Sequence, residues 1–438
     1  MKRSRLQTGM VTAVLAASVL TAYEGARRHP LAPPAPVAAA VSEAGAPAAG
    51  VAFAAASPAA AWRADDPRDA RMAPTPLRRA AYTLRKEVDR GAFPGAALVV
   101  GRGSRAVLEE GIGRVHWSGD GVDPERTVYD LASLTKVVAT TTAVMLLVED
   151  GEMELDAPVS RYLPEFSGGA RDRVTVRHLL THTSGLPAGA STGGFGGKAA
   201  RAWLMATPLA RAPGVKVEYS DVGFVTLYAA AEAAAGRPLP ELLEERVFGP
   251  LGMASTTFAP ADGCAECAPT ARRGDGSDLR GSVHDPIAAK LGGELAGNAG
   301  LFSTAHDVAR FAAMLASGGE LDGVRVLEEE TIGEFTRRQP GARTRALGWD
   351  TRDERGIGAA GLGMSAGAYG HTGFTGTSLW IDPERDTWVV LLTNRTYAPH
   401  AKVAIQSLRR TVHDDVAVAA DSGDLAVSKG LAVSAGPV

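Results

Sequence analysis

The stretch LASLTKVVATTTAV, residues 131–144, places a serine and a lysine three positions apart at the head of a long apolar run. At this spacing on a helix, Ser133 and Lys136 lie on the same face, one turn apart. The neighbouring leucine and valines would desolvate the lysine, which favours its neutral form. A neutral amine beside a hydroxyl can take its proton and so activate a weak nucleophile.

The N-terminal end of this helix adds free amides and a dipole that favour developing negative charge at Ser133. Taken alone, the pattern also fits a lysine that extends its ammonium group out of an ordinary helix. The chemical interpretation therefore depends on partners elsewhere in the chain.

The composition is typical of a soluble globular protein. The 438 residues carry a formal net charge of −3, with 45% hydrophobic and 22% charged residues. The isoelectric point of about 6.3 argues against nucleic-acid binding, which needs a basic surface. The sequence predicts neither a metal site nor an organic cofactor, because acyl transfer through a serine requires none.

Residues 1–26 read as an export signal, with a basic head at Lys2, Arg3 and Arg5 and an apolar core over 11–22. The core is too short for a comfortable membrane span. A cleavage site of small residues is not evident, so retention as a membrane anchor stays open. We expect a periplasmic, secreted or envelope-anchored protein.

Two further segments lack core periodicity. Residues 27–76 are rich in Ala and Pro, which predicts an extended linker. Residues 415–438 show neither helix nor strand spacing, which predicts a loose tail. The folded domain is therefore expected over 77–414.

Within that domain, strands are expected near both ends and helices between them. The segment 95–115 reads as two strands joined at Gly101–Gly103, and 377–395 as a hairpin turning at Pro383–Asp386. Apolar recurrence at three and four predicts helices over 76–93, 200–212, 223–235, 238–248, 306–319 and 401–414.

Terminal strands most economically share one antiparallel sheet. The predicted fold class is therefore α/β (α+β), an antiparallel sheet flanked by helices with a mostly helical second lobe. The sheet lobe would take 77–130 and 320–414, and the helical lobe about 131–319. We expect a cleft where the lobes meet.

Two more motifs follow the Ser133 stretch. VEYSDVGF, residues 217–224, places Tyr219 two before Asp221 at the start of a helix, and His371-Thr372-Gly373 stands at the start of a strand. The order S-x-x-K, Y-x-N, K-T-G resembles the serine β-lactamase and penicillin-binding protein superfamily, nearest its class C and esterase branch. The resemblance also covers RHLLTHTSGLP, FGPLGM, GNAGLFSTAHDVARF and the closing hairpin, and so spans nearly all of 77–414.

This resemblance implies a β-lactamase/transpeptidase-like fold and a role for each matched residue. Ser133 would be the acylated nucleophile, Lys136 would help to activate it, and Tyr219 would share proton transfer. The amides of Ser133 and Phe374 would form the oxyanion hole. Gly373 would let the substrate backbone approach its strand closely.

Two positions depart from the family pattern. Asp221 replaces the usual asparagine and adds a negative charge near the acyl site. His371 replaces lysine and removes a permanent cation. Together with Thr372 and Gly373, these residues would contact substrate. His284, in SVHDP, either contacts substrate or forms a loop turn.

We therefore predict an exported serine hydrolase that cleaves an ester, amide or peptide, including cell-wall-derived ones, through an acyl-enzyme on Ser133. The departures favour an esterase, amidase or peptidase branch over a true β-lactamase. A penicillin-binding D,D-peptidase or D-aminopeptidase is the alternative enzyme. A penicillin- or peptide-binding sensor with little turnover is the non-enzymatic alternative, against which the retained Ser133, Lys136 and Tyr219 count.

Other residues suggest sites without supporting context. Ser365 lies in a G-x-S-x-G pattern but lacks the strand and helix that a nucleophile elbow needs. His178 and His182 are four apart without a third metal ligand, so core or capping roles are expected. Trp349 is expected to cover the core.

The only cysteines are Cys264 and Cys267. A small disulfide loop, free thiols and a redox or metal pair all stay open for them.

Overall fold

The computed structural model describes residues 64–258, 260, 264–398 and 404–434, with side chains up to residue 428. The predicted signal and most of the predicted linker lie outside the described residues. The helices are α2 (Pro74–Asp89), α3 (Thr142–Glu149), α4 (Val176–Leu180), α5 (Gly197–Met205), α6 (Asp221–Ala235), α7 (Leu239–Leu243), α8 (Pro286–Leu291), α9 (Ala305–Ala316), α10 (Glu329–Thr336) and α11 (Ile405–Ser434).

The strands are β1 (Gly95–Arg102), β2 (Arg105–Gly113), β3 (Tyr129–Asp130), β4 (Ala271–Arg272), β5 (Asp278–Leu279), β6 (Phe302–Ser303), β7 (Glu320–Leu321), β8 (Val324–Arg325), β9 (Asp350–Thr351), β10 (Tyr369–Thr372), β11 (Ser378–Asp382) and β12 (Thr387–Thr393). Short 3₁₀ or π turns are η2 (Ala132–Leu134), η3 (Lys136–Thr141), η4 (Val159–Arg161), η5 (Gly169–Arg173), η6 (Glu244–Phe248) and η7 (Arg395–Tyr397).

The main sheet joins the two ends of the domain, as the sequence predicts. Its strand order is β2-β1-β12-β11-β10-β9, and every neighbouring pair is antiparallel. Both predicted hairpins, β1–β2 and β11–β12, are present. Strands β1 and β12 pair at the centre of the sheet, with Leu98 opposite Leu391.

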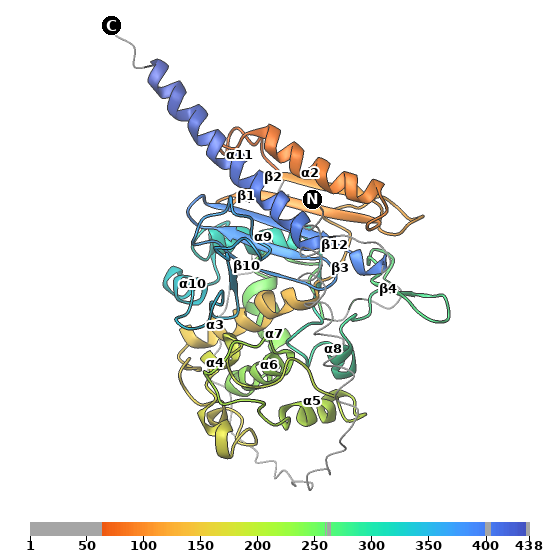
Figure 1. Cartoon of the computed structure of the whole chain (residues 1–438), viewed down its shortest axis with the longest axis vertical. Helices are drawn as coiled ribbons and strands as arrows, with labels where there is room; N and C mark the ends of the chain where they lie inside the picture. The colour runs from red at the N-terminus through yellow and green to blue at the C-terminus, as the bar shows by residue number, and fades with distance from the viewer. Residues whose placement is uncertain (1–63, 259, 261–263, 399–403, 435–438) are drawn as a thin grey trace, which may run out of the picture.

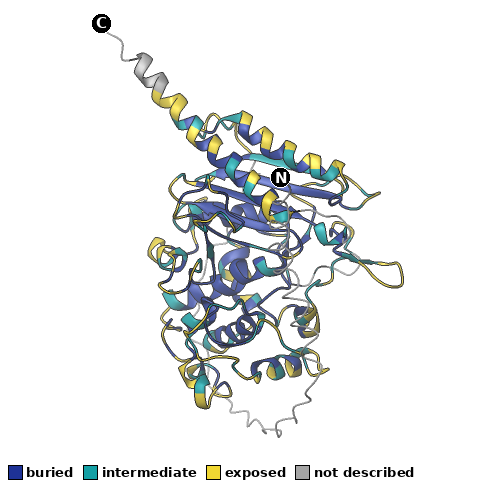
Figure 2. Cartoon of the chain, viewed as in Figure 1, coloured by how far each residue is buried: buried dark blue, intermediate teal, exposed yellow. Residues whose placement is uncertain are grey.

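The sheet is covered on both faces. Leu98 and Val100 of β1 belong to a core with α2 and α11 on one face. Ala97 and Val99 point to the opposite face, into the larger core that contains α9 and the helical lobe. Figure 1 shows α2 and α11 lying across one side of the sheet, with the helical lobe on the other side. Figure 2 shows the central strands almost wholly buried between these layers.

Two helices belong to lobes other than those predicted. Helix α9 was expected in the helical lobe, but it packs directly on β1, β11 and β12. Its fully buried Val308 and Phe311 cover a sheet face that would otherwise meet water. Helix α10 was expected with the sheet lobe, but it packs against α3.

The C-terminal prediction is wrong, because α11 does not end near residue 414. Val412, Val416, Ala419 and Ala420 are all buried at a helical spacing against α2 and the sheet. Ion pairs also join the helix to the body: Arg79–Asp415, Arg385–Asp421 and Arg102–Asp424. Two of these four residues are alanines, which add little side-chain volume, so the apolar signal of the stripe is weak in the sequence.

The N-terminal boundary also lies earlier than predicted. Helix α2 begins at Pro74, and prolines are favoured in a first helical turn because the missing N–H has no partner there. Before it, Met72 is 1% exposed, and the Asp65 amide donates to the Ala106 carbonyl. The last part of the predicted linker, residues 65–76, is therefore packed on the domain.

The opening stretch forms the centre of the molecule. Within the described residues, Ala132–Glu149 is long and apolar enough to cross a membrane by composition, but 83% of it is buried inside the fold. It is therefore a core helix of this domain.

Candidate active site

The chain around Ser133 is helical but irregular. It runs through the 3₁₀ turn η2, which contains Ser133, then the π turn η3, which begins at Lys136, and then α3. Ala132, directly before the serine, has φ of +48°, a left-handed conformation that costs free energy for a residue with a Cβ. Single π turns and strained residues are concentrated at functional sites.

The predicted pair of serine and lysine meets. The Lys136 Nζ lies 3.2 Å from the Ser133 Oγ, and Ser133 is partly open to solvent while Lys136 is fully buried. The same Nζ donates to the Asp221 carboxylate at 2.7 Å and to the Asn298 carbonyl at 2.8 Å. Three acceptors therefore surround one buried amine.

The predicted neutral state of Lys136 is wrong. Burial does act to lower its pKa, but the negative charge of Asp221 at 2.7 Å and the adjacent Tyr219 outweigh that effect, so the pKa is raised. Lys136 is therefore an ammonium group at neutral pH. Asp221, predicted to contact substrate, is the counter-ion of this lysine.

Tyr219 joins the same group, although it comes from the loop before α6. The Lys136 Nζ lies 4.8 Å from the centre of its ring, and both Lys136 and Ser133 are close enough to act on the pKa of its hydroxyl. Burial raises the Tyr219 pKa more than the nearby ammonium lowers it, so the hydroxyl keeps its proton at rest. The three predicted catalytic residues are thus together.

His371 packs beside Tyr219, with ring centres 6.1 Å apart. It is 3% exposed, and burial and the nearby cations Arg345 and Lys136 hold its pKa well below the usual range. His371 is therefore neutral at physiological pH. The sequence left its charge dependent on pH; the structure makes it an uncharged group.

Arg345 supplies a cation that sequence reasoning missed. Its guanidinium carbon lies 5.4 Å from the centre of the Tyr219 ring, on the same side of the molecule as His371. Its Nη1 is buried without a hydrogen-bond partner, and the Asp350 carboxylate is 3.8 Å away. Arg345 precedes His371 by 26 positions outside every family motif, so the sequence carries no signal for this contact.

The turn 373–377 after β10 is tied to the nucleophile segment. The Thr375 hydroxyl donates to the Asp130 carbonyl at 2.8 Å, and the Thr377 hydroxyl donates to the Leu131 carbonyl at 2.9 Å. These contacts tie the turn that contains Phe374 to the chain directly before Ser133. The Phe374 ring itself is 62% exposed.

Gly373 has a structural reason in addition to the predicted one. A Cβ at this position would lie 2.0 Å from the Thr377 Oγ1 and 2.4 Å from the Leu131 carbonyl oxygen. The glycine therefore allows the turn to pack on the chain before Ser133. Close approach of substrate and contact by Thr372 stay predictions.

A second residue missed by sequence reasoning lies beneath the nucleophile. Asp130 is 2% exposed, and its carboxylate accepts hydrogen bonds from the Ala132 amide at 2.8 Å and the His284 amide at 2.7 Å. Burial raises the pKa of Asp130 to about 6. His284 also stacks on Phe374, with ring centres 5.8 Å apart, so it lies beside the site.

The remaining sequence candidates have structural roles. His178 forms a capping box with Thr175 at the start of α4, and His182 is buried with its ring 4.5 Å from that of Tyr219. Ser365 is 7% exposed in a loop, without an adjoining strand or helix to form an elbow. Trp349 is fully buried, as predicted.

The cysteines form a disulfide. Cys264 and Cys267 are bonded, with 5.4 Å between their Cα atoms. Cys267 also pairs through its backbone with Val128, the residue directly before β3, in an isolated β-bridge.

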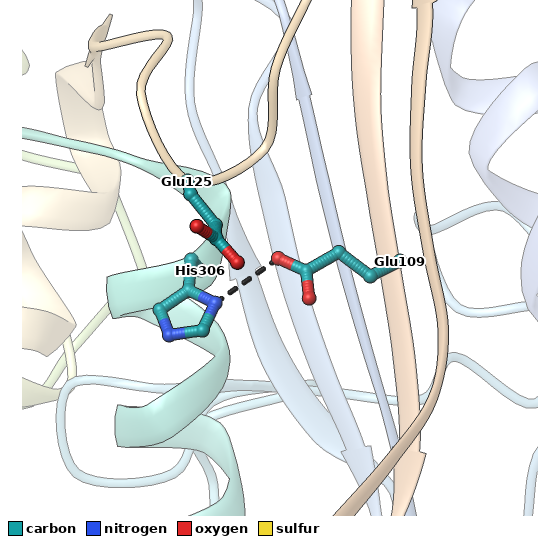
Figure 3. A group of neighbouring side chains, drawn as sticks. All are labelled: Glu109, Glu125 and His306. Carbon is teal, nitrogen blue, oxygen red and sulfur yellow. Dashed lines mark hydrogen bonds and ion pairs between the residues drawn. The ribbon is translucent and has the colours of Figure 1, made fainter. Parts of the chain in front are cut away.

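A group of possible metal ligands lies away from Ser133, on β2, the loop before β3 and α9. Glu109, Glu125 and His306 offer ligand atoms within 4.8 Å of one another. Figure 3 shows the His306 Nδ1 directed at Glu109, at a distance of 3.1 Å. Burial acts to lower the His306 pKa, but the hydrogen bond and the negative charge of Glu109 outweigh that effect, so the pKa is raised.

A surface cavity of about 340 Å³ lies next to Glu125, with Cys264 and Glu266 in its wall. This cavity is not at Ser133. The predicted cleft between the two lobes therefore stays a prediction.

A family model described as Beta-lactamase matches residues 80–412, about three quarters of the chain. This chain belongs to the Beta-lactamase family. Two curated members are similar over most of its length. A "Putative D-alanyl-D-alanine carboxypeptidase" of Salmonella agona (strain SL483) is 31% identical, covering 73% of this chain and 82% of that protein. A protein of the same name from Salmonella schwarzengrund (strain CVM19633) is 32% identical over the same shares.

Two solved structures are similar to this chain in fold. EstCE1, a hydrolase with promiscuous acyltransferase activity, is 23% identical with a TM-score of 0.61, covering 77% of this chain and 98% of that chain. A penicillin-binding protein homologue from Caulobacter crescentus is 20% identical with a TM-score of 0.65, covering 78% and 97%. These two likenesses show the fold. Together with the family match and the curated relatives, they show that this chain is a serine hydrolase of the β-lactamase family.

Proposed function

We propose that this protein is an acyl hydrolase that forms an acyl-enzyme on Ser133. The observation that carries the proposal is the meeting of two distant segments: the Lys136 ammonium lies 3.2 Å from the Ser133 hydroxyl and 4.8 Å from the centre of the Tyr219 ring. Acyl transfer needs a nucleophile, a proton acceptor and a group that returns the proton to the leaving atom. These residues supply all three.

The resting protonation states define the first step. Lys136 and Tyr219 are both protonated at rest, so neither can accept the Ser133 proton without releasing one of its own. Asp221 is the available base, because its carboxylate contacts the ammonium at 2.7 Å. As the Ser133 oxygen attacks the carbonyl carbon, its proton moves to Lys136 while Lys136 releases one toward Asp221. Tyr219 then donates a proton to the leaving atom and recovers it from the ammonium.

We further propose that the preferred substrates are short peptides with a free C-terminal carboxylate. His371 is neutral and cannot bind a carboxylate as a cation. The Nη1 of Arg345 can, because it is buried without a hydrogen-bond partner and its one ion-pair partner, Asp350, is 3.8 Å away. The name of the Salmonella relatives, a carboxypeptidase acting on D-alanyl-D-alanine, supports this substrate class. Ester hydrolysis is the second candidate, supported by the missing cation at position 371.

Ser133→Ala tests the acyl-enzyme. A fluorophosphonate should label wild-type protein once, and mass spectrometry should map the adduct to the peptide that contains Ser133. The variant should lose labelling and at least about 1,000-fold of turnover with p-nitrophenyl esters or D-alanyl-D-alanine peptides. An adduct on Ser365, or full activity without Ser133, would reject the proposed function.

Arg345→Gln tests the substrate class. We expect the KM for an acetylated peptide ending in D-alanyl-D-alanine to rise about 10- to 100-fold, because a charged hydrogen bond contributes about 1.5–3 kcal/mol. Hydrolysis of a neutral p-nitrophenyl ester should change less than about threefold. Arg343→Gln, at an exposed neighbouring position, is the matched control. Equal losses with both substrates would contradict carboxylate recognition.

We also propose export from the cytoplasm. The basic and apolar pattern of residues 1–26 supports this location. The Cys264–Cys267 disulfide is compatible with an oxidising compartment.

A further inference from the structure

Arg409 of α11 is buried without an acidic partner. It is 2% exposed, and its Nη2 donates to two carbonyls, those of Gly373 at 2.9 Å and Thr377 at 2.7 Å. Its Nε has no hydrogen-bond partner, and no carboxylate lies within ion-pair distance among the residues that the structure describes. Burial and repulsion from Arg395 lower its pKa to about 9, so it is still charged at neutral pH.

Burying a cation without a counter-ion costs free energy of folding, so a buried Arg409 calls for a structural or functional reason. The two carbonyls that it contacts are the two ends of the turn 373–377. The Gly373 amide also donates to the Thr377 carbonyl at 2.7 Å, which closes the turn. One guanidinium nitrogen therefore clamps the base of this turn from the α11 side.

The Gly373 carbonyl and the Phe374 amide belong to the same peptide unit. In a trans peptide the C=O and N–H bonds point in opposite directions, and no cis peptide occurs in the described residues. The Phe374 N–H is therefore directed away from Arg409, toward the other side of the turn. A charge-assisted hydrogen bond to a carbonyl polarises its peptide and makes the N–H a stronger donor.

The same turn is joined to the nucleophile segment by Thr375 and Thr377, whose hydroxyls donate to the carbonyls of Asp130 and Leu131. A second cation, Arg395, lies with its guanidinium carbon 5.1 Å from the centre of the Phe374 ring. Positive charge is thus concentrated around the turn that carries the expected oxyanion donor. Such preorganised charge stabilises an oxyanion without reorganisation during the reaction.

We propose that Arg409 is a positioning residue for the oxyanion hole, because it clamps the 373–377 turn and polarises the Gly373–Phe374 peptide. This inference rests on the proposed acyl-enzyme function. When the Ser133 oxygen bonds to the substrate carbonyl carbon, the C=O π electron pair moves onto the oxygen. The Phe374 amide stabilises that charge, while the Ser133 proton passes to Lys136 and Lys136 releases one of its own to the Asp221 carboxylate. Arg409 exchanges no proton or electron.

The test compares an oxygen ester with its thionoester, because C=S is a poor hydrogen-bond acceptor. In Arg409→Met, kcat for the p-nitrophenyl oxygen ester should fall about 10- to 100-fold, with KM changed less than about threefold. The kcat for the thionoester should fall much less, so the ratio of kcat for the oxygen ester to kcat for the thionoester should be much smaller than in the wild-type protein. Arg410→Met is the matched control, because Arg410 binds the carbonyls of Ile357 and Gly358 instead of this turn. It should behave as wild type.

Arg409→Lys decides the question if Arg409→Met does not fold. It keeps the charge and much of the apolar stem, but its nitrogen is one atom nearer to the backbone than the Arg409 Nη2 that donates to both carbonyls. It should therefore show the same change of ratio to a smaller extent. Equal losses with both esters, or no loss, in a variant with a native melting curve would overturn the inference. If wild-type protein shows no Ser133-dependent turnover, the proposed function fails instead, which separates the two outcomes.

Discussion

At the scale of single residues, the site departs from its family pattern in a connected way. Asp221 stands where the family has an asparagine, and its carboxylate holds Lys136 as an ammonium group. His371 stands where the family has a lysine, and it is neutral, with Arg345 nearby as a cation. Asp221 sets the charge of a neighbour, and the surroundings of His371 set its own charge, so neither replacement can be interpreted from its residue type alone.

Asp221→Asn should move the pH dependence of activity. Asp221 holds Lys136 as an ammonium group and accepts the proton that Lys136 releases, so without this carboxylate neutral Lys136 must act as the base. An amine loses its proton at higher pH than a carboxyl group, so we expect the acidic limb of the kcat/KM profile to shift up by about 1 pH unit or more, whereas Asp221→Glu should keep it near its wild-type position. A pH-rate series with an ester substrate measures both. An unchanged limb in the asparagine variant would show that Asp221 is not the base.

At the scale of elements, helix α11 combines two roles that its sequence hides. It covers the sheet with a stripe of small buried residues, and it places Arg409 behind the turn after β10. Alanines give little apolar periodicity, so the segment after residue 414 reads as a tail. The partner surface, made by α2 and β12, is what makes it a helix.

Val416 and Val418 test this assignment as a matched pair. Val416 is 1% exposed and Val418 is 42% exposed on the same helix. Val416→Ala should lower the free energy of unfolding by about 2 kcal/mol, because it leaves a cavity in the core. Val418→Ala should change it by less than about 0.5 kcal/mol. Urea denaturation measures both values, and equal small effects would mean that residues after 414 do not pack on the domain.

At the scale of the whole molecule, buried histidines make stability depend on pH. His413 is fully buried, with its Nδ1 3.0 Å from the Ala359 carbonyl, and burial lowers its pKa from 6.5 to about 4. His182 and His371 are also held neutral by burial. Asp130 has the opposite effect on the pH dependence of stability. Its pKa is raised to about 6, so as the pH falls it binds a proton in the folded state before it does so in the unfolded chain.

The free energy of unfolding should therefore fall as the pH is lowered from 7 toward 4. Below pH 6.5 His413 becomes protonated in the unfolded chain, whereas in the folded protein it stays neutral until about pH 4. This stabilisation is fully present above pH 6.5, and its loss amounts to roughly 3 kcal/mol at most for His413. His413→Gln should show a shallower decline in urea titrations between pH 7.5 and 4.5. A slope identical to wild type would assign the dependence to other groups.

The sequence by itself determined the features that depend on local spacing and order. The helical spacing of Ser133 and Lys136, the alternation in β1, β2, β11 and β12, and the order of the three motifs predicted the sheet, the family and the group around the nucleophile. Such patterns survive in a linear chain because neighbours three or two positions apart share a face.

Only the tertiary structure decided the charge states, the supporting contacts and the end of the domain. Asp221 reaches Lys136 across 85 positions, and Arg409 reaches Gly373 from the last helix. A pKa or a buried stripe of alanines depends on which distant groups exclude water and supply charge, and that information is created by packing. The protonation of the site is therefore a property of the fold, although its residue types are written in the sequence.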